Sequence, residues 1–318
     1  MPTLNDRAYE LANGLATDAN QLGIAVSTLG CGTRIIDCGV HARGSAEAGI
    51  RLAHICMGGA GIATFVRADP EAWEGPAIRC DGRNDPIATC LASQYAGWAI
   101  QGEKFFAMGS GPMRAAACRE ALFQEIGHCE RPERCVGVLE TSKLPPDAVC
   151  RDIADKCGVK PDRLTLLAAR TASEAGVVQI VARSLETALH KLHTIKFDLS
   201  CIRGGWGIAP LPPHGGDDVT ALGRTNDAIL YGASVHVVVE TEDSVLEEIG
   251  PRVPSNSSPD HGHPFGEIFA RYDHDFYRID PMLFSPARIT FLNHATNHSF
   301  HFGEFAPEIL AASFTTKK

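Results

Sequence analysis

Apolar residues recur along the chain with two different periods, and each period predicts its own set of elements. The stretches 104–108 and 234–240 predict strands, and the short apolar runs over 135–140 and 164–169 are typical of buried strands. The turn Gly30-Cys31-Gly32 between two strand-like runs predicts a hairpin over 23–40, and alternating apolar and polar residues on both sides of 294–297 predict a second hairpin. Apolar residues at helical spacing predict helices over the stretches 7–21, 86–101, 113–127, 146–157, 173–194 and 243–250.

Hairpins and strand–helix–strand passages occur in the same chain. This mixture predicts an α/β fold of α+β character, with mixed sheets and helices arranged in two lobes and a cleft between them. The stretch 204–216 is rich in Gly and Pro and is interpreted as an ordered loop. It is also the best position for a boundary between the lobes, within a chain that forms one unit over 1–318.

Composition narrows the class of protein. Hydrophobic residues make up 44% of the chain and charged residues 21%, as in globular proteins that dissolve in water. The apolar runs are too short to span a bilayer, and the first residues lack the basic and apolar regions of a secretory signal. We therefore expect a cytoplasmic protein. The net charge of −9 argues against a nucleic acid partner, because phosphate binding requires clustered Lys and Arg.

The sequence contains eleven cysteines, an odd number, and no Cys-x-x-Cys. In a chain of 318 residues this pattern predicts neither a disulfide framework nor a structural zinc site. We expect reduced thiols, packed mostly as small apolar side chains.

The turn Gly109-Ser110-Gly111-Pro112 lies between a predicted strand and a predicted helix. Glycines allow a backbone to approach a ligand, and free N–H groups at a helix start favour an anion. Arg114 stands where a dinucleotide fingerprint has its third glycine, so a nucleotide fold is not indicated. The alternative interpretation is that these residues form a tight turn with no ligand.

Three histidines, His294, His298 and His301, would share a face of a helix and could then hold zinc. The alternating pattern around them predicts a hairpin instead, in which His298 and His301 point to opposite faces. We therefore expect no metal site there.

Arg183 and Glu186 lie one turn apart on the predicted helix 173–194, so their side chains can meet. They lie opposite an apolar stripe formed by Val177, Val178, Val181, Leu185, Ala188, Leu189 and Leu192. An exposed ion pair contributing about 0.3–0.5 kcal/mol is the simplest interpretation. A functional role requires this polar face to line a cleft.

Four longer sequence blocks resemble a known family, and this resemblance favours a functional role for Arg183 and Glu186 over an exposed ion pair. They cover 105–112, 224–232, 264–269 and 275–281, reading FFAMGSGP, RTNDAILYG, PFGEIF and DFYRIDP. Their combination resembles the methenyltetrahydromethanopterin cyclohydrolases, and the resemblance extends from near residue 5 to near residue 305. The His-rich hairpin at 294–301 is a departure from the family pattern.

The resemblance implies an enzyme of one-carbon metabolism that reversibly hydrolyses 5,10-methenyl-tetrahydromethanopterin to the 5-formyl form, in formaldehyde oxidation or methanogenic CO2 reduction. It implies no metal and no redox cofactor, a pterin cleft between two lobes, and a homo-oligomer, by analogy a trimer. The family's catalytic arginine and glutamate correspond to Arg183 and Glu186.

Chemistry assigns roles to these residues. Glu186 is expected to activate water as a general base and then to return the proton, while Arg183 orients the carboxylate and tunes its ionisation. Polar loop groups commonly fix a ligand, so we expect substrate contacts from Gly109, Ser110, Gly111 and Pro112 and from Thr225, Asn226 and Asp227. A nicotinamide-dependent pterin oxidoreductase and a carrier-binding protein without turnover are the competing functions.

Overall fold

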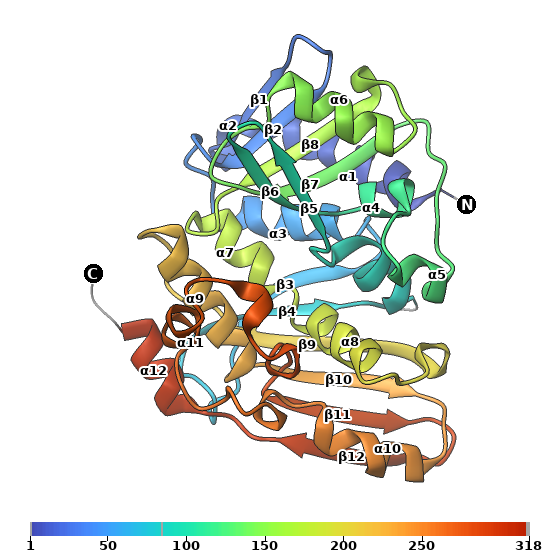
Figure 1. Cartoon of the computed structure of the whole chain (residues 1–318), viewed down its shortest axis with the longest axis vertical. Coiled ribbons are helices and arrows are strands. Elements are labelled where there is room, and N and C mark those ends of the chain that lie inside the picture. Colours follow the sequence, from blue (N-terminus) through green and yellow to red (C-terminus); the bar gives the residue numbers. More distant parts are fainter. Residues whose placement is uncertain (1, 84, 316–318) are drawn as a thin grey trace. The chain divides into compact units, whose positions relative to one another are not determined.

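The computed structural model of the chain describes residues 2–83 and 85–315, which form two compact units (Figure 1). Unit 1 contains the chain up to Ile62 together with Ala88–Gln179, and unit 2 contains Ala63–Ile87 together with the chain from Ile180 onward. The chain therefore passes from one unit to the other three times. The stretch 204–216 lies inside unit 2.

Unit 1 is built on a mixed six-stranded sheet with the strand order β1-β2-β8-β7-β6-β5. Its two central pairs, β2 with β8 and β8 with β7, are parallel, and the outer pairs are antiparallel. The strands are β1 (Ala25–Thr28), β2 (Arg34–Gly39), β5 (Trp98–Gly102), β6 (Phe105–Ser110), β7 (Cys135–Glu140) and β8 (Leu164–Ala169).

Helices cover both faces of this sheet, because side chains on a strand point alternately to its two sides. Ile36 and Leu167 pack under α1 and α3, whereas the neighbouring Ile35 and Leu166 pack under α4 and α6. The helices of unit 1 are α1 (Leu4–Thr17), α2 (Ala19–Leu22), α3 (Ala46–Cys56), α4 (Met113–Ala117), α5 (Leu122–Ile126) and α6 (Asp147–Lys156).

Unit 2 is built on a second six-stranded sheet with the order β12-β11-β10-β9-β4-β3. Strands β10 and β11 are parallel, whereas β9 pairs antiparallel with both β10 and β4. Its strands are β3 (Ile62–Arg67), β4 (Pro76–Asp81), β9 (Ile202–Pro210), β10 (Ser234–Val239), β11 (Arg288–Asn293) and β12 (His298–Gly303).

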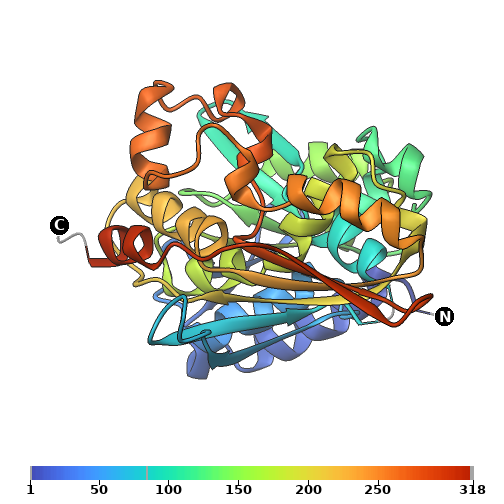
Figure 2. The ribbon, with the colours of Figure 1, turned by 90° about the horizontal axis from the view of Figure 1, so that it is seen from below.

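Helices of unit 2 gather on one face of its sheet, as Figure 2 shows. On β10 the valines at 235, 237 and 239 are fully buried, while the residues between them are only partly buried. The helices of unit 2 are α8 (Ser184–Thr194), α9 (Asp218–Leu230), α10 (Asp243–Ile249), α11 (Phe265–Arg271) and α12 (Pro307–Thr315), and α7 (Glu174–Val181) carries the chain into this unit. No helix among the described residues is both long and apolar enough to cross a bilayer.

The predicted α/β class, both hairpins and the four predicted strands are confirmed, and β7 and β8 are the buried strands that were expected. The interpretation of 204–216 as a loop was wrong, because its first half belongs to the internal strand β9. The glycines have a packing role there. A Cβ at Gly207 would lie 2.4 Å from the Ser184 Oγ, and one at Gly205 would lie 2.9 Å from the Leu185 Cδ1. Glycine thus lets α8 approach the strand closely.

Three predicted helices are shorter than expected. The helix predicted over 86–101 is a π-helix at Ile87–Gln94 followed by strand β5, which pairs with β6. The helix over 113–127 divides into α4 and α5, because Cys118 adopts a left-handed φ of 49° that ends α4. The helix over 173–194 divides into α7 and α8 at Arg183, whose φ of −94° and ψ of 6° depart from helical values.

Candidate functional site

The start of α8 holds the two residues predicted to be catalytic. Arg183 is the N-cap residue of this helix and Glu186 lies in its first turn, so the expected one-turn spacing is present. The residues next to them pack the helix against the sheet of unit 2. Ser184 is fully buried, and its hydroxyl lies 3.4 Å from the Cys80 Sγ of β4. The position of Arg183 and Glu186 is therefore fixed by contacts of their neighbours with the sheet.

Both side chains are withdrawn from solvent. Arg183 is 6% exposed and Glu186 is 5% exposed. The predicted apolar stripe is buried as well, so this part of the chain is covered on more than one side. These exposures contradict the interpretation of Arg183 and Glu186 as an exposed ion pair. Burying a carboxylate and a guanidinium is costly unless both are paired or hydrogen-bonded, which makes their placement a specific feature of unit 2.

Lys191, on the same helix, is a buried cation that the sequence did not single out. Its Nζ donates hydrogen bonds to the Ser257 Oγ, at 3.2 Å, and to the carbonyl oxygen of Met282. Burial lowers the pKa of Lys191 to about 8, although the nearby Asp280 carboxylate opposes this change. These two hydrogen bonds of Lys191 thus connect α8 to the segments around 255–257 and 281–283. A lysine within an amphipathic helix gives no sequence signal that distinguishes this role from an exposed charge.

Thr225, Asn226 and Asp227 lie within helix α9 and not in a loop, which corrects the expectation that they are loop groups. The Thr225 hydroxyl donates to the carbonyl oxygen of Ala221 at 3.0 Å, and the Asn226 Nδ2 donates to that of Leu222 at 2.9 Å. Both bonds stay within the helix. Of the three residues, only Asn226 is partly exposed. Their role as substrate contacts remains a prediction.

Asp227 connects two helices of unit 2. It is 1% exposed, and its Oδ1 accepts the backbone N–H of Phe265 at 2.7 Å, which fixes the first residue of α11. Burial raises the pKa of Asp227 to about 7, against the opposing effect of its hydrogen bonds. The block 224–232, which carried part of the resemblance, is therefore in large part a packing element.

The turn Gly109–Pro112 belongs to unit 1, at the end of β6 and the start of α4. All four residues are buried. Gly111 has a φ of 86°, which favours glycine, and its N–H donates to the carbonyl oxygen of Ser93 at 2.8 Å. The amide that was expected to receive an anion therefore already has a partner. Ser93 lies in the π-helix, a segment that the sequence did not connect with this turn.

The histidine-rich hairpin is β11 and β12, as predicted. His298 pairs with Asn293 across the ladder and His301 pairs with Thr290, so the two histidines alternate in facing. The Nδ1 of His298 lies 2.6 Å from the Asp243 Oδ2, and the Nδ1 of His301 lies 3.0 Å from the Thr290 Oγ1. Within the described ranges 2–83 and 85–315, no group of three or more His, Cys, Asp or Glu could hold a metal ion.

The cysteines depart from expectation at one pair. Cys118 and Cys129 are joined as a disulfide with their Cα atoms 5.6 Å apart, so the prediction that all eleven are thiols was wrong. Their separation in sequence carries no signal, because the pairing depends on how the chain returns beside α4. Seven of the nine free cysteines are buried, which confirms the prediction that they are mostly packed as apolar side chains.

A hollow of about 510 Å³ lies on the surface of unit 1 beside α1, and it is lined by Arg7, Tyr9, Leu11 and Arg134 among others. None of the predicted site residues lines it. The polar groups of chemical interest are instead buried at the start of α8 in unit 2 and at the turn after β6 in unit 1.

The comparisons with known proteins all indicate the same family. The profile of a family described as Cyclohydrolase (MCH) matches residues 3–314. Several similar proteins are named methenyltetrahydromethanopterin cyclohydrolase. The protein of Methylobacterium sp. (strain 4-46) is 44% identical over 98% of each chain. That of Xanthobacter autotrophicus is 46% identical over 96% of this chain and 90% of its own. That of Methanosarcina barkeri (strain Fusaro / DSM 804) is 37% identical over 99% and 98%.

Proposed function

The chain belongs to the methenyltetrahydromethanopterin cyclohydrolase family, and from this premise we propose that it reversibly hydrolyses 5,10-methenyl-tetrahydromethanopterin to 5-formyl-tetrahydromethanopterin. The support is identity of 37–46% to proteins of that name over nearly the whole chain. The observation that carries the mechanism is the burial of Glu186 and Arg183 in one turn at the start of α8.

The substrate carbon lies between two nitrogens and shares their positive charge. Glu186 takes a proton from water, and the oxygen of that water forms a bond to the carbon. The resulting tetrahedral intermediate then breaks one C–N bond, and the carboxyl group returns the proton to the nitrogen that leaves. The hydroxyl group loses its proton to solvent as the formyl C=O forms. The net change is therefore the addition of one water and the release of one proton, and the reverse sequence closes the ring. General acid–base catalysis of this kind is typically worth about 10²–10⁴-fold in rate.

Arg183 acts on the carboxylate in this proposal. Burial favours a neutral carboxyl group, whereas a neighbouring guanidinium favours the carboxylate. A glutamate under both influences can accept and release a proton within one catalytic cycle. The guanidinium also restricts the carboxylate to a small number of orientations, which keeps its oxygen aimed at water.

Contacts to the substrate are proposed from Gly109, Ser110, Gly111 and Pro112 in unit 1 and from Thr225, Asn226 and Asp227 in unit 2. Asn226 is the most accessible of the second group. For the first group, all four residues are buried, and the Ser110 hydroxyl donates to the carbonyl oxygen of Val138 at 3.3 Å.

The reaction is proposed to need neither a metal nor a redox cofactor. Hydration of an amidinium carbon involves no change in oxidation state, and the carbon is already electrophilic. Extensive dialysis against a chelator should leave the rate unchanged. A loss of activity that zinc restores would contradict this proposal.

We further propose that the enzyme works in the cytoplasm, in one-carbon metabolism, as a homo-oligomer and by analogy a trimer. Light scattering coupled to size-exclusion chromatography of the purified protein tests the assembly. A mass equal to a single 34.0 kDa chain at micromolar concentration would contradict it.

The decisive test of the function is an ultraviolet assay with purified protein and the methenyl substrate. A cyclohydrolase removes the methenyl chromophore without any nucleotide. A nicotinamide-dependent oxidoreductase would require a reduced or oxidised nicotinamide for any change, and a carrier-binding protein would bind the pterin and leave the chromophore intact.

A further inference from the structure

Cys118 and Cys129 differ from the other cysteines in their accessibility as well as in their bond. Their Cα separation of 5.6 Å is the usual distance for a disulfide. Cys129 is exposed and Cys118 is partly exposed, whereas seven of the free cysteines are buried. A soluble thiol or disulfide therefore has access to this pair.

The pair closes a loop that leaves and rejoins α4. At the beginning of the loop Cys118 ends the helix in a left-handed conformation, which is uncommon for a residue other than glycine. At its end the N–H of Glu130 donates to the carbonyl oxygen of Ala115, at 2.9 Å. The hydrogen bond of Glu130, the residue after Cys129, thus holds the end of the loop against α4.

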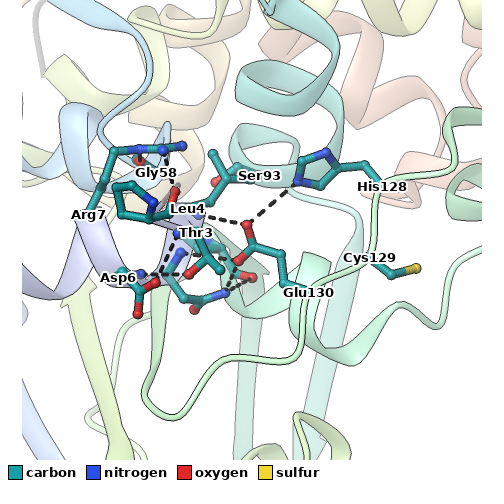
Figure 3. Close-up of polar contacts among 12 residues, drawn as sticks. Thr3, Leu4, Asp6, Arg7, Gly58, Ser93, His128, Cys129 and Glu130 are labelled. Carbon is teal, nitrogen blue, oxygen red and sulfur yellow. Dashed lines mark hydrogen bonds and ion pairs between the residues drawn. The ribbon is translucent and has the colours of Figure 1, made fainter.

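Glu130 also binds the start of α1, as Figure 3 shows. Its Oε1 accepts the N–H of Leu4 at 2.6 Å, and its Oε2 accepts the N–H and the Nδ2 of Asn5 at 3.2 and 2.8 Å. A carboxylate at this position satisfies N–H groups that the helix leaves free and complements the positive end of the helix dipole.

Asn5 carries this attachment to the turn after β6. It is fully buried, its Nδ2 also donates to the carbonyl oxygen of Pro112 at 2.9 Å, and its Oδ1 accepts the N–H of Val136 at 2.9 Å. One continuous set of hydrogen bonds therefore joins Glu130, beside the disulfide, to the last residue of the Gly109–Pro112 turn.

We propose that Cys118 and Cys129 form a thiol–disulfide exchange site whose redox state sets how firmly Glu130 holds the start of α1 and the Gly109–Pro112 turn. The co-reactant is a small disulfide such as oxidised glutathione. The Cys129 thiolate attacks one sulfur of that disulfide and expels a thiol. The Cys118 thiolate then attacks the Cys129 sulfur and expels the second thiol. Two protein thiols are oxidised, one disulfide is reduced to two thiols, and the two protons pass to those thiols.

The structural consequence follows from where the crosslink lies. With the disulfide formed, the loop has little conformational freedom, so holding Glu130 beside α1 costs little entropy. With the bond reduced, the loop gains conformational freedom, and the hydrogen bonds of Glu130 and Asn5 open more often. This inference concerns unit 1 alone and does not depend on the proposed reaction.

The experiment uses the full chain equilibrated with oxidised glutathione or with dithiothreitol. Alkylation followed by mass spectrometry counts the accessible thiols, and hydrogen exchange follows peptides covering 3–8 and 109–116. Reduction should expose two more thiols, at 118 and 129, and raise exchange in both peptides by about tenfold or more. The unfolding midpoint should fall by roughly 5–10 °C.

Variants separate the pair from general effects of reductant. Cys118→Ser and Cys129→Ser should each reproduce the reduced exchange pattern and no longer respond to oxidant. Cys201→Ser, at a partly exposed free cysteine of unit 2, should respond like the wild type. If one variant does not fold, the other and the wild-type titration still decide. Unchanged exchange on reduction, or a pair that stays unlinked at every glutathione ratio, would overturn the proposal.

Kinetics then separates this inference from the proposed function. If the Gly109–Pro112 turn contacts the substrate, reduction should raise KM several-fold with little change in kcat. If exchange changes while KM does not, the redox site stands and the role of the turn in substrate binding falls.

Discussion

Glu130 in unit 1 and Asp227 in unit 2 are both largely withdrawn from solvent, yet their pKa values are displaced in opposite directions. Burial raises the pKa of the Glu130 carboxyl, but hydrogen bonds from His128, Leu4 and Asn5 outweigh it and leave the pKa lowered. Asp227 is buried with fewer donors, and burial raises its pKa to about 7.

The contrast between Glu130 and Asp227 shows that burial alone does not decide whether a carboxyl group is ionised. A carboxylate that meets the N–H groups of a helix start remains an anion and acts as an anchor. A carboxylate with one or two donors lies close to the balance between its two forms. Glu186 shares the low exposure of both residues, and its proposed role requires the second kind of behaviour.

Replacing Glu186 with Gln should produce the largest change. The amide keeps the volume but cannot take a proton, so kcat should fall by about 10²-fold or more, while substrate binding is retained. Stopped-flow absorbance of the methenyl chromophore measures both. Glu247→Gln, at an exposed glutamate of α10, is the matched control and should match the wild type.

Arg183→Ala completes this test. Loss of the guanidinium should slow turnover and raise the pKa that governs the rate, because the charge that favours the carboxylate is gone. A Glu186→Gln enzyme that turns over at near wild-type speed would end the proposed mechanism, even though the family assignment would stand.

Replacing Glu130 with Ala should lower stability with no direct effect on chemistry. The change leaves the N–H groups of Leu4 and Asn5 without their acceptor, and we expect a loss of about 2–3 kcal/mol. Urea unfolding measures it, with Glu133→Ala, an exposed neighbour, as the control. A loss no greater than that of the control would mean that Glu130 is not an anchor.

Asp227→Asn should change the pH dependence of stability. Because the pKa of Asp227 is raised in the folded state, the native protein keeps a proton that the unfolded chain has released. The wild type therefore loses stability as pH rises from about 4 to about 7. The variant should lack this loss and gain about 2 kcal/mol relative to wild type between pH 5 and pH 8. Urea unfolding at both pH values checks it, and a constant difference would refute it.

His298→Ala should have the smallest effect. His298 is 67% exposed, so its contact with Asp243 is screened by solvent. Asn293 and Thr296 also donate to Asp243, which leaves the hairpin attached to α10. The unfolding midpoint should stay indistinguishable from wild type, and a clear decrease would show that this exposed pair stabilises the hairpin.

The parts of this protein that depend on the local order of residues could be predicted from its sequence. Alternation over β11 and β12 predicted the hairpin, and apolar runs predicted β7, β8 and β10, because strand periodicity is written in consecutive residues. Helical spacing also placed Arg183 and Glu186 one turn apart. The family blocks then assigned a reaction to that pair.

Features that depend on residues distant in the chain could be known from the folded structure alone. The glycines of β9 suggested a loop until the packing of α8 against them gave the reason for their small size. The Cys118–Cys129 pairing, the burial of Glu186 and the bonds of Asn5 to Pro112 and Val136 arise from segments that meet after folding. A local pattern specifies which face of an element is apolar, but the neighbours that bury a polar group are supplied by the rest of the chain.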